Sequence, residues 1–515
     1  MPLTRPTTTL QPYAGLTAYA GDLHNHCGIS YGHGSIEEAY ANAKQQLDFA
    51  TVTGHAAWHD IPREPAHVYD YHLEGFARLA SQWDHVQQVT ENAHVDGEFV
   101  TFLSFEWHSL TYGDHCVYFR AGQAPLDISQ AQSLEELREK LREFQKQGIP
   151  AFVLPHHIGY KNGWRGINWD TYTEELSPVV EIVSMHGSGE NEPGPRPYLH
   201  TMGPRDGAST AQSGLARGNT FGFIGSTDHH SAHPGSYGYG KAMVWADSLT
   251  REGIWDAIAA RRTYAVTGDR IMLATSVNGA PMGSVISAQG ERHIEVDVLG
   301  GDQIDYVEVL RNNEIIAQAR PTAKHTTEFN GMLAVSVGWG EYGVEADWDV
   351  TITVQGGRIE SVDPRLHGDD VVDPTRKAGE STGESLSDWR LVDDHTITLR
   401  THTSGNHTVM TDSTQQLGLH VIGDDDTVLE VVANGTRVER TVGQLRAGSH
   451  SEYTGGFLSP AILLHRAADH AQRSVQMSFT DPGSSDSTRD WYYVRVRQVN
   501  DQYAWSSPIW VERAQ

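Results

Sequence analysis

The stretch "GDLHNHCGIS", residues 21–30, places two histidines directly after a short run of small and apolar residues. His24 and His26 are separated by one residue, so in an extended segment both imidazoles face the same side. A pair of this kind at the end of a strand is typical of the first half of a metal site. Because His-x-His alone is a weak signal, the rest of the chain must supply the other ligands.

The overall composition limits the possible partners. The chain has 515 residues, enough for two or three domains. Its 38 basic and 66 acidic residues give a net charge of −28, which argues against nucleic acid or an anionic membrane as a partner. Cys27 and Cys116 are the only cysteines, so a disulfide framework and a cysteine-type zinc site are excluded.

The sequence also suggests where the protein works. No apolar run reaches the roughly 20 residues of a membrane span, and the N-terminal stretch lacks the apolar core of a signal peptide. We therefore expect a cytoplasmic protein that acts on a small molecule, with no nucleic-acid or membrane partner. The sequence leaves the oligomeric state open, and a homo-oligomer is allowed.

The pattern of predicted secondary structure changes near residue 275. Before it, short apolar runs at 48–55, 98–108, 149–157, 178–187 and 220–230 alternate with helical patterns at 35–46, 69–94 and 133–148. The first helical pattern starts with a capping-box pair, Ser35 and Glu38. This alternation predicts a parallel α/β barrel. After it, short strands joined by turns such as "RNNE" (311–314) and "ANGT" (433–436) predict a β-sandwich, with a long exposed loop at 362–390.

Several predicted strands of the first half end in imidazole or carboxylate side chains. Barrel enzymes carry their catalytic groups at this end of the strands. Imidazole and carboxylate together suit zinc, manganese or iron, and a carboxylate can join two ions. The residues in question are His55, Glu106, His108, His115, His156, His157, Glu181, His186, Asp228, His229 and His230.

As an ordered set, these motifs resemble the PHP (polymerase and histidinol phosphatase) family of metal-dependent hydrolases, in particular the large PHP-like proteins with an appended β-domain. The resemblance covers residues 18–275. It implies a distorted seven-stranded (β/α) barrel of PHP type over residues 1–275, followed by a β-sandwich-like domain over residues 276–515. It also implies two or three divalent ions, with zinc, manganese and iron left open.

The resemblance assigns ligands residue by residue. One ion would take His24, His26, Glu106 and Asp228, and a second would share Glu106 with His115 and His157. A third would take His33, His55 and His230, although this chain reads "TGH" where the family has Thr-Asp-His. Two alternatives stay open: His156 in place of His157, and His108 or His186 in place of His115.

The same end of the predicted barrel offers further polar residues. We expect Asp228, His186 and His59 to act in catalysis, His186 as a general acid or an additional ligand. Arg165 or Lys241 would orient an anionic substrate. The predicted substrate-binding residues are Tyr160, Lys161, Trp164, Arg165, Ser188, Glu190, Tyr237 and Lys241.

The predicted function is that of a metal-dependent hydrolase that uses a metal-bound hydroxide. We expect a phosphoesterase that acts on a small organic, sugar-like phosphate. The first alternative keeps the metals and changes the reaction to that of a lactonase, amidase, sulfo-ester hydrolase or lyase on a carbohydrate-like compound. The second is a carbohydrate-binding protein whose metals are structural and whose β-domain carries the function.

Overall fold

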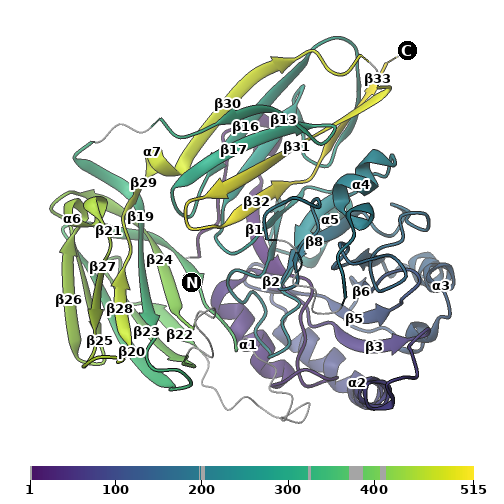
Figure 1. The fold of residues 1–515 in the computed structure, drawn as a ribbon, viewed down its shortest axis with the longest axis horizontal. Helices are drawn as coiled ribbons and strands as arrows, with labels where there is room; N and C mark the ends of the chain where they lie inside the picture. Colours follow the sequence, from purple (N-terminus) through teal and green to yellow (C-terminus); the bar gives the residue numbers. More distant parts are fainter. Residues whose placement is uncertain are drawn as a thin grey trace.

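The structure is a computed structural model that describes residues 3–196, 198, 203–322, 326–369, 387–405, 413–485 and 487–514. Figure 1 shows the N-terminal body in purple and blue beside a green β-sandwich, with a third body of teal and yellow strands above them. Among the described residues, no helix combines the length and apolar composition needed to cross a membrane.

The prediction of a (β/α) barrel is wrong. The structure is 41% strand and 18% helix, and its described residues form separate sheets with no closed barrel. The strands β5 (Leu103–His108), β6 (His115–Phe119) and β7 (Ala151–Pro155) show the reason. β6 pairs antiparallel with both neighbours. Only residues 109–114 separate β5 from β6, whereas a parallel connection needs a dozen residues or more.

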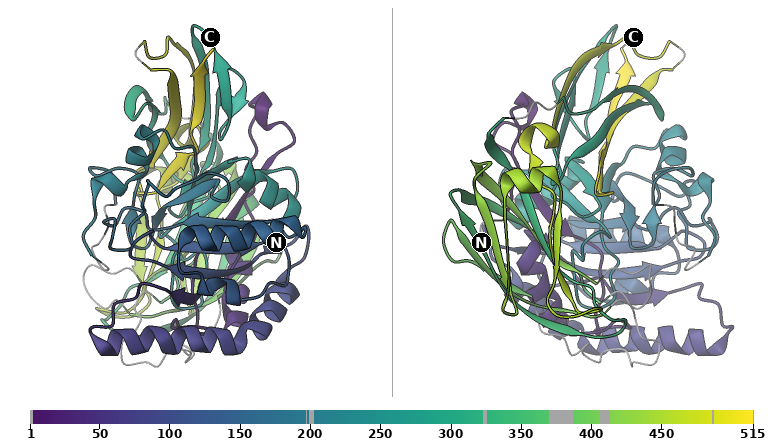
Figure 2. Two further views of the ribbon diagram at one scale, coloured as in Figure 1. Left: turned by 90° about the vertical axis from the view of Figure 1, so that its right-hand side faces the viewer. Right: turned by 60° about the vertical axis from the view of Figure 1, so that its left-hand side comes forward.

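The helices of the N-terminal body confirm the three predicted helical patterns. Ser35 Oγ accepts a hydrogen bond from the Glu38 amide, and the Glu38 carboxylate accepts one from the Ser35 amide, so the predicted capping box is present. The longest helix, α2, runs along one edge of this body (Figure 2). The helices are α1 (Ile36–Gln46), α2 (Ala66–Ala93), α3 (Leu134–Lys146), α4 (Ala211–Ala216) and α5 (Arg251–Ala259).

Two small sheets carry the strands that lead into the candidate site. One has the order β3-β5-β6-β7, where β3 is Gly54–Trp58 and pairs parallel with β5. The other has the order β10-β8-β9, from β8 (Val179–Ser184), β9 (Gly187–Ser188) and β10 (Gly222–Gly225). The strands are almost entirely buried, because other elements cover both of their faces.

An eleven-stranded sheet joins the two halves of the chain. β12 pairs with β32, so that Tyr264 lies opposite Ser506. The predicted division at residue 275 therefore has strands of one sheet on both of its sides, and it remains a prediction. The sheet contains β1 (Thr17–Asp22), β2 (Phe49–Ala50), β4 (Val100–Thr101), β11 (Lys241–Ala246), β12 (Thr263–Val266), β15 (Val285–Ala288), β17 (Ile304–Arg311), β18 (Glu314–Ala319), β31 (Arg489–Gln498), β32 (Tyr503–Ser506) and β33 (Ile509–Arg513).

A four-stranded sheet packs with part of the eleven-stranded sheet to form the upper body of Figure 1. Leu273, Val296 and Val494 belong to their shared buried core. The four strands are β13 (Met272–Val277), β14 (Ala280–Pro281), β16 (Arg292–Leu299) and β30 (Ser474–Asp481).

The green body is a sandwich of two sheets. In β20, Trp348, Val350 and Ile352 are buried while the residues between them are more exposed, as expected for a strand with one face on a core. One sheet contains β19 (Glu328–Gly338), β21 (Arg358–Arg365), β24 (Gln415–Asp424), β27 (His450–Tyr453), β28 (Ala461–Leu464) and β29 (Ala468–Asp469). The other contains β20 (Ala346–Gln355), β22 (Asp388–Leu391), β23 (Thr396–Thr403), β25 (Val428–Ala433) and β26 (Thr436–Thr441).

The short helices α6 (Val442–Ala447) and α7 (His470–Arg473) follow strands of the sandwich. The predicted exposed loop at 362–390 begins inside β21, where Val362 is fully buried, and ends inside β22. Its middle, residues 370–386, lies outside the described residues.

Candidate metal centre

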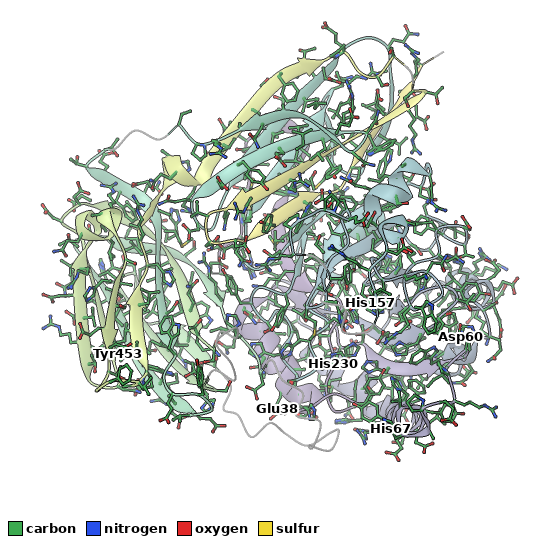
Figure 3. All side chains as sticks on the ribbon, viewed as in Figure 1. Glu38, Asp60, His67, His157, His230 and Tyr453 are labelled. Atoms are coloured by element: carbon green, nitrogen blue, oxygen red, sulfur yellow. The ribbon has the colours of Figure 1, made fainter. Side chains whose placement is uncertain are left out.

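The two histidines of the opening motif lie beside the segment that follows β10. The His26 amide donates to the His229 carbonyl at 2.7 Å, and the Asp228 amide donates to the His24 carbonyl at 2.7 Å. These backbone bonds hold residues 24–26 against residues 228–230. His157 and His230 accordingly lie within the same body in Figure 3.

His24, His26 and Asp228 form the first group of converging ligand atoms. Asp228 Oδ1 lies 3.2 Å from His24 Nε2 and 3.1 Å from His26 Nε2. The other carboxylate oxygen of Asp228 lies 2.8 Å from His186 Nε2. Asp228 has a φ of 56°, a left-handed backbone conformation that is uncommon outside glycine and frequent at functional sites.

Glu106 belongs to two of the remaining groups of converging ligand atoms. Its Oε1 lies 2.9 Å from His156 Nε2 and 3.2 Å from His108 Nδ1, and its Oε2 lies 3.3 Å from His55 Nε2. The ligand groups that converge are Glu106 with Asp114, His156 and His157; His55 with Glu106 and His108; and His26 with His55 and His230. His156 and His157 therefore both belong to the group around Glu106, whereas the sequence leaves open which of the two would be a ligand.

The structure does not bring His115 to these groups, and strand alternation explains why. Across the β5–β6 pair, Glu106 lies opposite Cys116 and Trp107 lies opposite His115. Side chains alternate between the faces of a strand, so Cys116 shares the face of Glu106, whereas His115 shares that of Trp107. His115 Nδ1 lies 2.9 Å from the Gly113 carbonyl.

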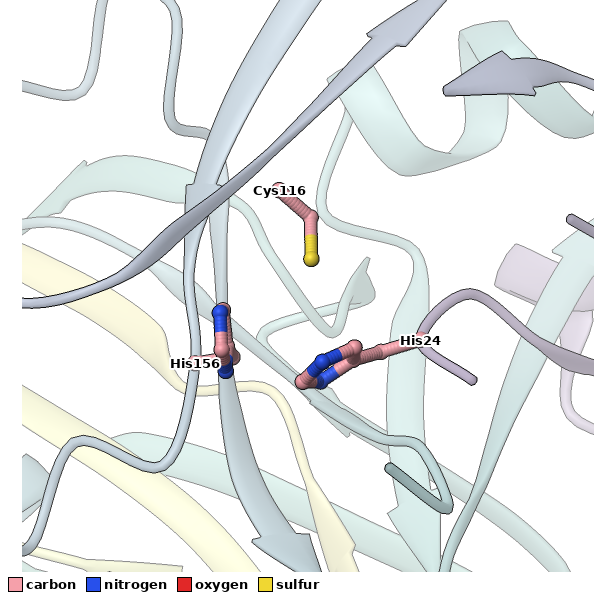
Figure 4. A group of neighbouring side chains, drawn as sticks. All are labelled: His24, Cys116 and His156. Atoms are coloured by element: carbon pink, nitrogen blue, oxygen red, sulfur yellow. The ribbon is translucent and has the colours of Figure 1, made fainter. Parts of the chain in front are cut away.

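Asp114 and Cys116 are site residues that the sequence reasoning missed. Asp114 Oδ2 lies 3.3 Å from His157 Nε2 and 3.1 Å from His108 Nδ1. The Cys116 thiol points toward the rings of His24 and His156 (Figure 4). The period of two within "GDHCVYF" is the signal that could have identified both, because it places residues 114 and 116 on one face.

The third early histidine, His33, is buried near the site and belongs to none of these groups. Its amide donates to the His230 carbonyl at 2.8 Å. Glu181 contacts two of the ligand residues: its Oε2 lies 2.9 Å from His24 Nδ1, and its Oε1 accepts from the His157 amide. A carboxylate on the second nitrogen of a ligating histidine fixes the orientation of its ring.

The electrostatics of the site suit ligands of a cation. Burial lowers the pKa of His26 and of His108 to about 4, so both rings are neutral at pH 7 and can offer a lone pair. Burial, together with Asp114 and Asp228, raises the pKa of Glu106 well above its ordinary value. Burial raises the pKa of Asp114, but Arg165 and His108 together hold the pKa of that carboxyl well below its usual range.

Unsatisfied polar atoms provide the test of fit for a metal. Glu106 Oε2 and His156 Nδ1 are buried without a hydrogen-bond partner, and His156 Nε2, although 2.9 Å from Glu106 Oε1, is not oriented to form a hydrogen bond. Leaving such groups unpaired costs about 1–3 kcal/mol each, and more for a charged group. A divalent cation held by these atoms would remove that cost, so the residues present fit a metal centre.

Four of the predicted substrate-binding residues lie in the loop after β7. Arg165 Nη2 lies 2.5 Å from Asp114 Oδ2, and its guanidinium carbon lies 4.9 Å from the centre of the Trp58 ring. Tyr160 is buried with its hydroxyl 3.1 Å from His186 Nδ1. Trp164, 59% exposed, and Lys161 lie on the surface of the same loop.

The other predicted substrate residues have different surroundings. The Glu190 carboxylate accepts hydrogen bonds from Arg495, Tyr493 and Trp505 of the C-terminal strands, which leaves it no role in the groups above. Ser188 Oγ accepts from the Glu190 amide at 3.3 Å.

Tyr237, Lys241 and His59 also make contacts outside the ligand groups. The Tyr237 hydroxyl donates to Asp269 at 2.7 Å. Lys241 is fully buried with its Nζ 5.9 Å from the centre of the Tyr237 ring, and burial lowers its pKa to about 8. His59 stacks on Trp107, with the ring centres 4.9 Å apart.

Comparisons with known proteins place the chain among proteins without a described activity. A family model described as "Protein of unknown function (DUF3604)" matches residues 36–194 and 235–278. An uncharacterized protein of Chlamydia pneumoniae is 24% identical over 279 residues, 49% of this chain and 43% of that protein. An uncharacterized protein of Chlamydia trachomatis is 27% identical over 205 residues, 36% of this chain and 32% of that protein. The chain thus spans less than half the length of these curated relatives.

Among solved structures, a two-domain protein from Bacteroides vulgatus, described as containing a predicted PHP-like metal-dependent phosphoesterase, aligns with a TM-score of 0.34 and 14% identity. The alignment covers 64% of this chain and 85% of that structure.

Proposed function

We propose that this protein is a metal-dependent hydrolase. The observation that carries the proposal is the buried arrangement of Glu106 and Asp228 among neutral histidines, with lone pairs that no hydrogen bond satisfies. One ion would be held by His24, His26 and Asp228, and another by Glu106, Asp114, His156 and His157. A third ion would be held by His26, His55 and His230.

Divalent ions at these positions would supply a water activated near neutral pH and would neutralise negative charge on a substrate. The surrounding residues have roles of their own. His186 lies between the Asp228 carboxylate and the Tyr160 hydroxyl, so it is positioned to hold a proton for a leaving group. Asp114 fixes the Arg165 guanidinium beside the site.

We further propose a phosphoester of a small organic molecule as the substrate. In a chain with a net charge of −28, the loop after β7 carries two cationic side chains: Arg165, which Asp114 holds beside the site, and Lys161, which lies on the surface. A guanidinium is suited to bidentate binding of phosphate oxygens. The ordered His and carboxylate motifs resemble those of the PHP phosphoesterases and favour the same substrate class.

The test combines metal analysis of the purified protein with a substrate panel of phosphomonoesters, phosphodiesters, sulfate esters and lactones. We expect at least one bound ion of zinc, manganese or iron per chain and turnover of a phosphoester. The variant His24→Ala should lose activity, while His85→Ala, at an exposed position of α2, should keep it. Metal with turnover only of lactones or sulfate esters would contradict the substrate class, and a metal-free protein would contradict the proposed function.

A further inference from the structure

The β-sandwich exposes an unusual group of apolar side chains at one end. Tyr342 and Tyr453 are 58% and 56% exposed, and Phe457 is 90% exposed. Tyr342 follows β19, Tyr453 is the last residue of β27 and Phe457 follows it; the two segments meet where a Cβ on Gly340 would lie 3.4 Å from Pro460. Exposed aromatic side chains concentrated in this way usually mark a binding surface.

These segments enclose an open cavity of about 730 Å³. Trp339, Tyr342, Tyr453 and Leu458 supply its apolar lining. Trp339 and Leu458 have φ values of 60° and 67°, in the left-handed region that bulky residues rarely occupy. Residues are kept in that region where the surroundings hold them, often at ligand sites. The volume lies within the range of small-molecule pockets.

The polar groups of the cavity are two carboxylates and two serine hydroxyls, from Glu341, Glu452, Ser451 and Ser459. Within the part of the chain that the structure describes, the hydroxyls of Tyr342 and Tyr453 make no hydrogen bond, and Glu341 makes no ion pair. The hydroxyls of Tyr342 and Tyr453 and the Glu341 carboxylate are therefore available to a ligand, whereas the Ser459 hydroxyl is already bonded to the Gly455 amide and the Pro460 carbonyl.

We propose that this cavity, lined by Trp339, Tyr342, Tyr453 and Glu341, is a binding site for a neutral oligosaccharide. The C–H faces of sugar rings pack on aromatic side chains, and sugar hydroxyls bind carboxylates and serine hydroxyls. The aromatic rings make no contact with one another among the described residues, so they do not form a closed cage around a small cation. The carboxylates disfavour an anionic membrane.

The proposed sugar site is separate from the metal centre. Tyr453 lies on the sandwich, at the opposite side of the molecule from His157 (Figure 3). The two sites can therefore be inactivated independently, and the failure of one proposal does not imply failure of the other.

The experiment measures binding of cellohexaose, chitohexaose, xylohexaose, mannohexaose and maltohexaose to the full chain by calorimetry and tryptophan fluorescence. We expect saturable binding of at least one hexaose with a Kd on the order of 0.1 mM. Tyr342→Ala and Tyr453→Ala should each weaken it about tenfold. Tyr453→Phe, which keeps the ring, should stay within about twofold.

Two control variants complete the design. Ile315→Ala changes an exposed apolar residue of β18 and should bind as the original chain does. Glu106→Gln, at the metal centre, should also bind unchanged. The proposal would be overturned if none of the five hexaoses bound, or if Tyr342→Ala and Tyr453→Ala bound the hexaose as tightly as the original chain does. Loss of binding in Glu106→Gln would place the sugar at the metal centre instead, and a dimer that dissociates in the tyrosine variants would identify a second copy as the occupant.

Discussion

Glu106 is one of two carboxylates of the candidate centre, with Asp228, that each lie within 4 Å of four histidine rings. His55, His108 and His156 lie within 3.3 Å of its oxygens, and His26 Nε2 lies 3.5 Å away. A carboxylate in this position can belong to two ion sites at once. Its substitution should therefore affect more of the centre than substitution of a histidine that has one such partner.

We predict that Glu106→Gln loses at least one equivalent of bound metal and at least about 100-fold in kcat/KM. The amide keeps the size of the side chain but removes the negative charge that offsets the ion. Metal content by plasma mass spectrometry and turnover on the best substrate of the panel provide the measurements. Glu139→Gln, at an exposed position of α3, is the matched control, and full metal content in Glu106→Gln would contradict the prediction.

Asp48 shows a second, structural use of a buried carboxylate. Its oxygens lie 2.8 Å from Arg5 Nε and 2.8 Å from Arg270 Nη1. Burial alone would raise the pKa of Asp48, but the two arginines hold it below its ordinary value of 3.8. A carboxyl whose pKa is lower in the folded than in the unfolded chain stabilises the fold above the unfolded pKa. That stabilisation is lost as the pH falls through the folded value.

Asp48→Asn should lower the free energy of unfolding by about 3 kcal/mol at pH 7, because it removes the nearer of the two carboxylates beside the buried Arg270 and leaves only Asp363, 3.9 Å away. The difference from the original chain should shrink as the pH falls below 3.8. Thermal unfolding at several pH values measures both effects. Asp70→Asn, at an exposed position of α2, should change neither, and a pH-independent difference for Asp48→Asn would refute the assignment.

Spacing in the sequence predicts only part of the candidate site, the shared face of His24 and His26. The convergence of these two residues with Glu106 and Asp228 is implied by the resemblance to the PHP family, and the four side chains lie together in the structure. The choice between His115 and Asp114 depends on which face of β6 turns inward, and that depends on pairing with β5. Pairing of strands is set by tertiary packing, which local sequence does not determine.

At the scale of elements, the sequence predicts helix starts better than strand pairing, because a helix cap depends on residues close together in the chain. The pair Ser35 and Glu38 predicts the start of α1, and both reciprocal hydrogen bonds are present. The barrel prediction failed because it took the spacing of buried strands as parallel alternation. The turn at residues 109–114 and the antiparallel β6 are not distinguishable by periodicity from a strand within a βα unit.

We predict that Ser35→Ala destabilises the protein by about 1 kcal/mol, because the Glu38 amide loses its acceptor. Ser35→Asp should retain stability, since its carboxylate accepts the same bond and interacts favourably with the helix N-terminus. The midpoint of thermal unfolding distinguishes the two variants. An equal decrease in both would show that the cap does not contribute.

At the scale of the whole molecule, the C-terminal strands reach the loop that follows β9. Arg495 of β31 donates to both oxygens of Glu190 at 3.0 Å and also pairs with Glu308 at 2.6 Å. Residues 190 and 495 are 305 positions apart, and no local pattern connects them. The sequence predicts Glu190 as a substrate-binding residue, and in the structure its carboxylate accepts hydrogen bonds from Tyr493, Arg495 and Trp505 of the C-terminal strands.

Variants of Arg495 and Arg497, two residues of β31, can test the contact between the C-terminal strands and Glu190. Arg495 is 11% exposed and serves two buried carboxylates, whereas Arg497 is 36% exposed and pairs with Asp305. Arg495→Leu should lower the stability by about 3–5 kcal/mol, because it leaves the charges of Glu190 and Glu308 buried without a partner. Arg497→Leu should cost at most about 1 kcal/mol, since its charge is screened by solvent.

Glu190 lies four residues after His186, so loss of the Arg495–Glu190 contact should also change the position of His186 in the candidate site. We expect Arg495→Leu to raise KM and lower kcat together at temperatures where the chain is still folded, while Arg497→Leu changes neither. Calorimetric unfolding and steady-state kinetics on the same preparations separate the two effects. If Arg495→Leu and Arg497→Leu unfolded at the same temperature, the C-terminal strands would not stabilise the N-terminal body through Glu190.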